Sequence, residues 1–138
     1  MKASHEDTIA KTCNENQFKR IKMKIFHIVD KDEWSTAKKN GTYSPPSLDK
    51  DGFIHCSRAD QVIKVANSFF KNKPNLVILR IDQSKVENEI KTEAPLEAPW
   101  SDILYPHIYG ELNIDAVECE LEFPCQSDGL FLLPENLL

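Results

Sequence analysis

The sequence predicts an α+β domain with a largely antiparallel sheet. Short runs of β-branched, aliphatic and aromatic residues outnumber the stretches with helical periodicity, and the helical stretches come early in the chain. Within residues 115–123, the apolar Val117, Cys119, Leu121 and Phe123 alternate strictly with Glu118, Glu120 and Glu122, as in a half-buried strand with one wet face.

The first strand and helix are expected at the run "KIFHIV", residues 24–29, and directly after it. Asp30 is placed to cap the helix, with Glu33 at the spacing of a capping box. The pair Asn40-Gly41 is expected to end that helix, because glycine tolerates a positive φ. Residues 42–52 contain two prolines and an Asp-Gly pair, which predicts a loop.

A second strand, a second helix and a central strand are expected next. Residues 52–56 ("GFIHC") form the strand, and Ser57 caps the helix. The apolar face of that helix recurs at three- and four-residue steps, in Val62, Val65, Ala66, Phe69 and Phe70. Residues 75–82 are dense in branched aliphatic side chains, which is typical of a central strand.

Four further strands complete the expectation. They cover residues 89–93, 107–110, 115–123 and 129–133, and residues 94–100 form a loop between the first two.

Length and composition indicate one domain and exclude some classes of function. The chain has 138 residues, and we expect a disordered or loosely packed polar leader over 1–22 and a single domain over 23–138. No apolar run is long enough for a membrane span or a secretory signal, so we expect a soluble cytoplasmic protein without a membrane partner. The formal charge of −5 argues against an extensive nucleic-acid surface. The four cysteines show no CxxC pair, so we expect free thiols and no metal.

Three histidines occupy apolar segments, where an imidazole needs partners for its ring nitrogens. They are His27, His55 and His107. An unsatisfied buried polar atom costs about 1–3 kcal/mol, so a shared cleft that uses the three rings explains them better than chance burial. We therefore predict that distant strands bring them to the wall of one pocket.

Strand alternation assigns faces to their neighbours. His55 and Ser57 are expected on one side, with Cys56 pointing into the core. Ser57 and the start of the following helix then form an anion site. By the same alternation, His107 and Tyr109 share a face, where Tyr109 can stack on a flat ring.

The motifs "IFHIV…EW", "GFIHCS…QV", "LVILRID", "KTE" and "YPHIYGELN…AV" resemble the domain of unknown function 952 family, which consists of small bacterial proteins. The resemblance runs from about Lys24 to about Phe123. That family looks similar in structure to the ADP-ribosyltransferase superfamily, which includes NAD-dependent RNA 2′-phosphotransferases. The resemblance implies NAD as the cofactor and a cleft between two small sheets, with two or three helices.

The same resemblance implies roles for individual residues. His27 matches a first-strand histidine that contacts a ribose, and His55 with Ser57 matches a His-x-Ser strand motif. Tyr109 is the candidate for stacking on nicotinamide. His107 belongs to the family's Pro-His-x-Tyr-Gly motif, and Glu93 matches its strand-end glutamate.

Three functions remain open at this stage. The first is an NAD-dependent transferase with His27, His55, Glu93 and His107 as catalytic residues and with His27, Ser57 and Tyr109 holding the cofactor. The second is a module that binds a nucleotide or another small ligand without chemistry. The third is a metal site made by the three histidines, for which no HxH or HExxH spacing exists.

Overall fold

The computed structural model of the protein describes residues 24–138, so the predicted leader lies outside the described residues. In chain order the elements are β1 (Lys24–Asp30), α2 (Lys31–Asn40), β2 (Thr42–Tyr43), α3 (Pro46–Asp51), β3 (Ile54–His55), α4 (Val62–Phe69), β4 (Leu76–Asp82), η1 (Gln83–Lys85), β5 (Glu89–Glu93), β6 (Tyr105–Tyr109), β7 (Leu112–Asn113), η2 (Ile114–Ala116) and β8 (Val117–Glu122). The predicted α+β class is confirmed, and all the strand pairings between Lys24 and Leu138 are antiparallel.

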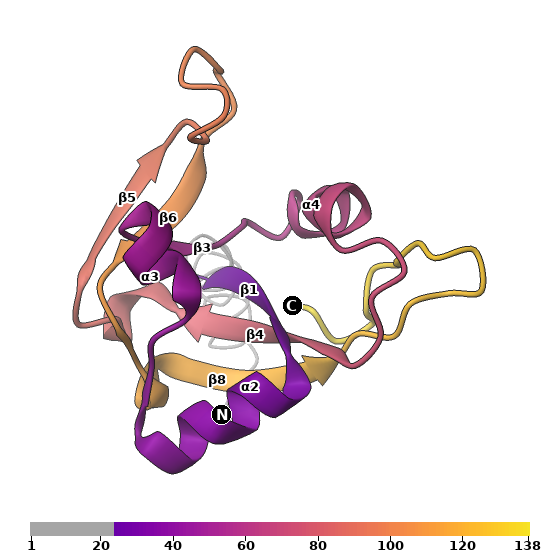
Figure 1. Ribbon diagram of the computed structural model, residues 1–138, viewed down its shortest axis with the longest axis horizontal. Coiled ribbons are helices and arrows are strands. Elements are labelled where there is room, and N and C mark those ends of the chain that lie inside the picture. Colours follow the sequence, from indigo (N-terminus) through magenta and orange to yellow (C-terminus); the bar gives the residue numbers. More distant parts are fainter. Residues whose placement is uncertain (1–23) are drawn as a thin grey trace, which may run out of the picture.

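In the described part of the chain, the strands form two three-stranded sheets and one short ladder. Sheet 1 has the order β1-β4-β8, sheet 2 has the order β3-β6-β5, and β2 pairs with β7. The predicted central strand is confirmed, since β4 lies between β1 and β8. Figure 1 shows sheet 1 across the middle of the molecule, with sheet 2 at one side of it.

Two apolar clusters pack on opposite faces of sheet 1. Alternation along β1 sends Ile25 and Val29 into one cluster and Phe26 and Ile28 into the other. The first cluster fills the space between sheet 1, sheet 2 and α2, and the second lies under α4 and the C-terminal segment. The strands β1 and β4 are therefore buried on both faces, whereas the glutamates of β8 stay exposed, and α2 and α4 lie on opposite sides of sheet 1 (Figure 1).

The loop expected at residues 42–52 is wrong in part, because it contains β2 and α3. Pro46 begins α3, where its fixed φ and missing N–H suit the first helical turn. Gly52 ends α3 at a φ of 88°. Prolines that indicate a loop by composition here start a helix.

The helix cap predicted at Ser57 is also wrong. Ser57 and Phe26 exchange two backbone hydrogen bonds of 2.8 Å, which connects the end of β3 to β1. The helix α4 begins at Val62, and the Gln61 side chain instead accepts a hydrogen bond from the Arg58 amide. The backbone carbonyl of Ser57, which would accept the first hydrogen bond of a helix, thus accepts instead from the amide of Phe26 on β1.

The strand predicted at residues 129–133 is absent from the described residues. The Phe131 amide donates to the Asn67 side chain at 2.7 Å instead of to another strand. The Phe131 ring stacks on Phe123, with ring centres 4.6 Å apart, and is buried in the second cluster. The apolar run at residues 129–133 thus indicated burial and not a strand, because the Phe131 backbone amide bonds to a side chain and not to a neighbouring strand.

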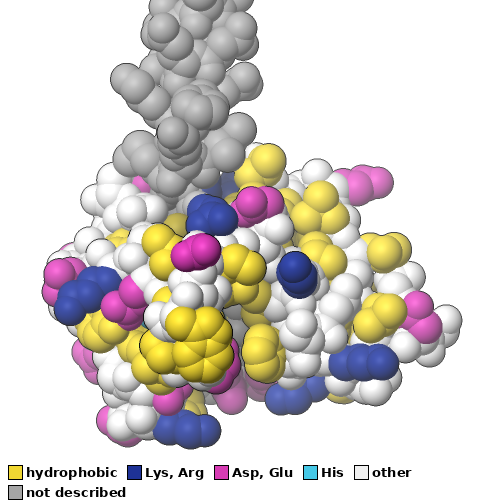
Figure 2. All heavy atoms as spheres, turned by 90° about the horizontal axis from the view of Figure 1, so that it is seen from above, with side chains coloured by type: hydrophobic (Ala, Val, Ile, Leu, Met, Phe, Trp, Pro, Cys, Tyr) yellow, Lys and Arg dark blue, Asp and Glu magenta, His cyan; other side chains and the backbone are white. Residues whose placement is uncertain are grey.

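None of the helices between Lys24 and Leu138 is long and apolar enough to cross a bilayer. On the face drawn in Figure 2, acidic, basic and apolar side chains are interspersed without a broad field of positive charge. The thiols of Cys56, Cys119 and Cys125 are free, while Cys13 lies outside the described residues.

Candidate functional site

The register of sheet 2 brings two of the three histidines together. His55 on β3 lies opposite His107 on β6, and the neighbouring pair Ile54 and Ile108 points into the first core cluster. Because side chains alternate along a strand, both imidazoles lie on the face of sheet 2 that turns away from that cluster. Their ring centres are 5.6 Å apart. We call this surface the histidine face, defined by Phe53, His55, Glu93, His107 and Tyr109.

Glu93, at the end of β5, is held by two partners through the same carboxylate oxygen. His107 Nδ1–H donates to Oε2 at 2.8 Å, and the Tyr109 hydroxyl donates to Oε2 as well. No residue from Lys24 onward hydrogen-bonds the second oxygen, Oε1, and the Glu93 side chain is 34% exposed. The carboxylate is therefore anchored by one oxygen and can offer the other to a ligand.

His55 is paired with a carboxylate in a similar way. Its Nε2–H donates to Asp51 Oδ2 at 2.7 Å, from the last residue of α3. The side chain is 50% exposed, and no described residue hydrogen-bonds Nδ1. In the neutral ring this leaves a lone pair on Nδ1 that faces no protein donor.

The ring of Phe53 supports both imidazoles from below. It stacks on His107 with ring centres 3.9 Å apart and planes 18° apart, and it lies 4.7 Å from His55. Both Phe53 and His107 are almost fully buried. The side-chain packing thus fixes His107 in place, whereas His55 keeps access to solvent.

The electrostatics of the face follow from these contacts. Hydrogen bonds from Tyr109 and His107 lower the pKa of Glu93, so its carboxylate is charged at neutral pH. The same contact with Glu93 raises the pKa of Tyr109 to about 12. Burial lowers the pKa of His107, and the hydrogen bond to Glu93 offsets this only in part. The face therefore holds a neutral His107 beside an ionised Glu93.

His27 does not join the histidine face, contrary to the predicted common pocket. It lies on the side of β1 that faces the first core cluster, and both ring nitrogens are engaged. Nδ1–H donates to the His55 carbonyl at 2.6 Å, and Nε2 accepts from the Tyr43 hydroxyl at 2.7 Å. Burial lowers the pKa of His27 to about 4, so the ring is neutral. No ring nitrogen of His27 remains for a ribose or a metal.

Ser57 is likewise removed from the face. It is buried where the chain passes from sheet 2 to sheet 1, and both of its backbone polar groups are paired with Phe26. The predicted anion site at Ser57 also lacks its helix start, because α4 begins five residues later. His55 and Ser57 therefore differ in their surroundings, since the His55 side chain is half exposed and Ser57 is buried.

The metal alternative finds little support in the geometry, and Cys56 does not supply a nucleophile. Between Lys24 and Leu138, no group of three or more His, Cys, Asp or Glu side chains is arranged to hold a metal ion. Cys56 is buried in the first cluster, as alternation predicted, and burial raises the pKa of its thiol. A buried, protonated thiol is a poor nucleophile.

Sequence reasoning missed several residues of the arrangement. Asp51 was assigned to a loop, although it precedes His55 by four residues, and this spacing is the one signal for their contact.

Phe53 and Lys91 lie on the same side of sheet 2 as the two histidines, as alternation along their strands requires. Lys91 Nζ lies 4.6 Å from the centre of the Tyr109 ring. Tyr43 gave no signal, because its partner His27 is distant in sequence and only tertiary structure joins them.

The fold and this face define a small α+β protein in which one sheet presents two imidazoles, each bound to a carboxylate. The chain belongs to the family described as "Protein of unknown function (DUF952)", whose model matches residues 28–119. The family expected from the motifs is thus confirmed. The likeness to ADP-ribosyltransferases stays a prediction.

Solved structures of a bacterial protein resemble this one closely. The crystal structure of protein CC0527 from Caulobacter crescentus is 29% identical, with a TM-score of 0.73, and the match covers 83% of this chain and 97% of that one. The solution structure of the same protein is 28% identical, with a TM-score of 0.67 and coverage of 78% and 90%. None of the curated proteins matches the chain.

Proposed function

We propose that the histidine face binds a nucleotide of the NAD or ADP-ribose type and transfers its ADP-ribosyl group. The observation that carries this proposal is the carboxylate of Glu93, whose Oε2 is anchored by two hydrogen bonds while its Oε1 has no hydrogen-bond partner among the described residues. A fixed carboxylate of this kind can accept a hydrogen bond from a ribose hydroxyl. It can also stabilise the positive charge that develops on the ribose as the bond to nicotinamide breaks.

The remaining residues of the face fit complementary roles. His107 and Tyr109 are positioning residues, because they orient Glu93 and are themselves held by packing. His55 is the accessible general base, since Nδ1 carries a free lone pair and Nε2–H is fixed by Asp51. In the transfer, nicotinamide leaves with the bonding electron pair, the acceptor bonds to the ribose carbon, and the acceptor's proton passes to His55.

The fit to NAD also requires one movement. The ammonium group of Lys91 lies over the ring of Tyr109, where the sequence predicts that nicotinamide stacks. A flat ring entering there displaces Lys91, which can then bind a phosphate. The second candidate, a nucleotide-binding module without turnover, requires the same movement of Lys91.

Binding and turnover are separated by one pair of measurements. The protein is titrated with ADP-ribose and with NAD while thermal unfolding is followed, and nicotinamide release from NAD is measured by chromatography. A ligand at about 100 times its dissociation constant stabilises the fold by about 2.7 kcal/mol. Stabilisation with release supports the transferase, stabilisation without release supports the binding module, and neither effect overturns both.

Glu93→Gln tests the assigned residue. The amide keeps a hydrogen-bond acceptor for Tyr109 but removes the charge, so nicotinamide release should fall by about 100-fold. Glu120→Gln is the matched control. Glu120 lies on β8 of sheet 1, away from the histidine face, and pairs with Lys38 of α2. Equal losses in both variants would contradict the assignment.

A further inference from the structure

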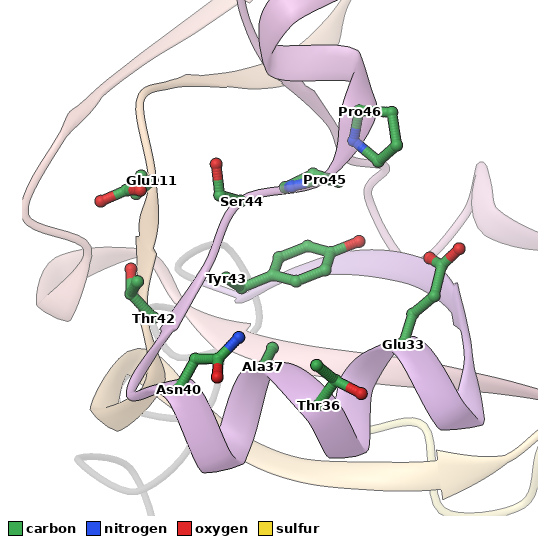
Figure 3. A pocket seen from close by; sticks show the side chains of 10 residues that line it. All are labelled: Glu33, Thr36, Ala37, Asn40, Thr42, Tyr43, Ser44, Pro45, Pro46 and Glu111. Carbon is green, nitrogen blue, oxygen red and sulfur yellow. The ribbon is translucent and has the colours of Figure 1, made fainter.

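A groove separate from the histidine face runs along α2. It has a volume of about 510 Å³ and lies between α2, β2 and the turn that leads into α3 (Figure 3). Cavities of this size are typical of small-molecule sites. We propose that this groove binds a linear aliphatic polyamine.

The charges of the groove select a cation. Glu33 and Glu111 lie at its opposite ends, and among residues 24–138 no Lys or Arg lines it (Figure 3). Neither carboxylate has a basic partner within ion-pair distance in the described chain. The two lysines of α2 that form ion pairs, Lys31 and Lys38, instead bind glutamates of β8. The helix therefore turns these positive charges away from the groove and leaves a negative charge at each end.

The floor between the carboxylates suits a chain of methylene groups. It is formed by apolar surfaces, namely Ala37, the ring of Tyr43, Pro45 and Pro46. Tyr43 is fixed there, because its hydroxyl donates to His27 and its ring packs on Trp34 with centres 5.8 Å apart. The groove is thus preformed, and a ligand does not have to order its floor.

The length of the groove indicates more than a short diamine. The helical rise from Glu33 to Asn40 alone is about 10 Å, and Glu111 lies at the Asn40 end (Figure 3). A linear triamine, which is longer than a diamine, is therefore expected to place one terminal ammonium group at each carboxylate. Asn40 and the hydroxyls of Thr36 and Ser44 line the path and can accept from the central one.

Calorimetric titration with spermidine tests the proposal. We expect one site, weaker binding at high salt because the carboxylates are exposed, and weaker binding still of putrescine. Glu33→Gln and Glu111→Gln should each lower the affinity about three-fold, and the double variant about ten-fold. Amide and side-chain NMR shifts should map to Thr36, Tyr43 and Ser44.

Glu87→Gln is the matched control, since it removes one exposed carboxylate outside the groove. The proposal is overturned if spermidine does not bind below about 1 mM. It is also overturned if Glu87→Gln weakens binding as much as the groove variants, or if magnesium at equal ionic strength reproduces the NMR shifts. Because these residues are distinct from the histidine face, the result does not depend on NAD binding.

Discussion

His27 is a buried histidine with a structural task. Its Nδ1–H binds the carbonyl of His55 on sheet 2, while its backbone belongs to sheet 1. Its Nε2 accepts from Tyr43, which forms the floor of the groove. One neutral imidazole thus connects both sheets and the groove, and this arrangement depends on the ring remaining uncharged.

The stability of the protein should therefore fall in mild acid. The folded-state pKa of His27, about 4, lies below its unfolded value of 6.5, so the folded protein binds the proton less readily than the unfolded chain. This stability is present above about pH 6.5 and is lost as the pH falls toward 4, by roughly 3 kcal/mol. Urea unfolding at pH 7.0 and pH 4.5 measures the loss. His27→Gln should make the difference smaller, whereas a wild-type slope in that variant would assign the effect to other groups.

The hydrogen bond between Glu93 and His107 should be visible in the protonation of the imidazole. In the wild type, Nδ1 carries the proton because it donates to Glu93. Since Glu93 raises the pKa of His107 against the effect of burial, Glu93→Gln should lower that pKa further. Histidine nitrogen NMR over a pH titration measures both the tautomer and the pKa. An unchanged titration would show that the contact is weak in solution.

The helix α2 is specified by local signals at both ends. Asp30 accepts hydrogen bonds from the amides of Asp32 and Glu33, as the capping spacing predicted. Gly41 ends the helix in the left-handed region at a φ of 87°. Lys38 and Lys39 lie in the last turn, where their positive charges interact favourably with the negative end of the helix dipole. Because its cues lie within the segment, this element could be predicted from sequence.

Removing the cap should destabilise the protein by a measurable amount. Asp30→Ala leaves two amides without their acceptor and should cost about 1 kcal/mol of unfolding free energy. Asp30→Asn keeps a capping oxygen and should cost much less. Denaturant unfolding of the two variants compares them directly, and equal losses would point to the charge of Asp30 instead of its hydrogen bonds.

The elements that sequence did not predict are those whose backbone partners are distant. Ser57 offers a capping side chain, yet its amide and carbonyl bind Phe26 on another strand. Residues 42–43 pair with β7, about seventy positions away. A local pattern carries no record of such partners, so the pairing overrides the local preference.

The C-terminal segment shows the same effect across the whole molecule. It has no strand, although Phe131 fills the second cluster and Leu132 beside it is 66% exposed. Arg80 on β4 donates to backbone carbonyls of residues 136–138 and so fastens the segment to sheet 1. The core of this protein includes irregular chain as well as regular elements.

A matched pair of substitutions tests this role of the segment. Phe131→Ala removes a buried ring stacked on Phe123 and should cost about 3–5 kcal/mol of unfolding free energy. Leu132→Ala changes an exposed side chain and should cost less than about 0.5 kcal/mol. Denaturant unfolding measures both, and a small loss in Phe131→Ala would mean that the segment packs loosely in solution.

In the candidate site, too, features within one strand could be predicted from the sequence, whereas contacts between sheets could not. Alternation within a strand placed Cys56 in the core and put His107 and Tyr109 on one face, and the structure agrees with both. The expected meeting of His27 with the other two histidines depended on how two sheets face each other. In the fold they present different sides, so His27 reaches only the backbone of His55.

The sequence by itself determined the α+β class, the first strand and helix, the buried central strand and the wet face of β8, because their apolar periods and caps are local. Tertiary structure alone decided that Asp51 pairs with His55, that Glu93 is anchored by one oxygen, and that Tyr43 meets His27. These contacts join different strands and helices, and their geometry depends on register and on the packing of one sheet against another. Local patterns in the sequence carry no information about distances between residues that are far apart in the chain.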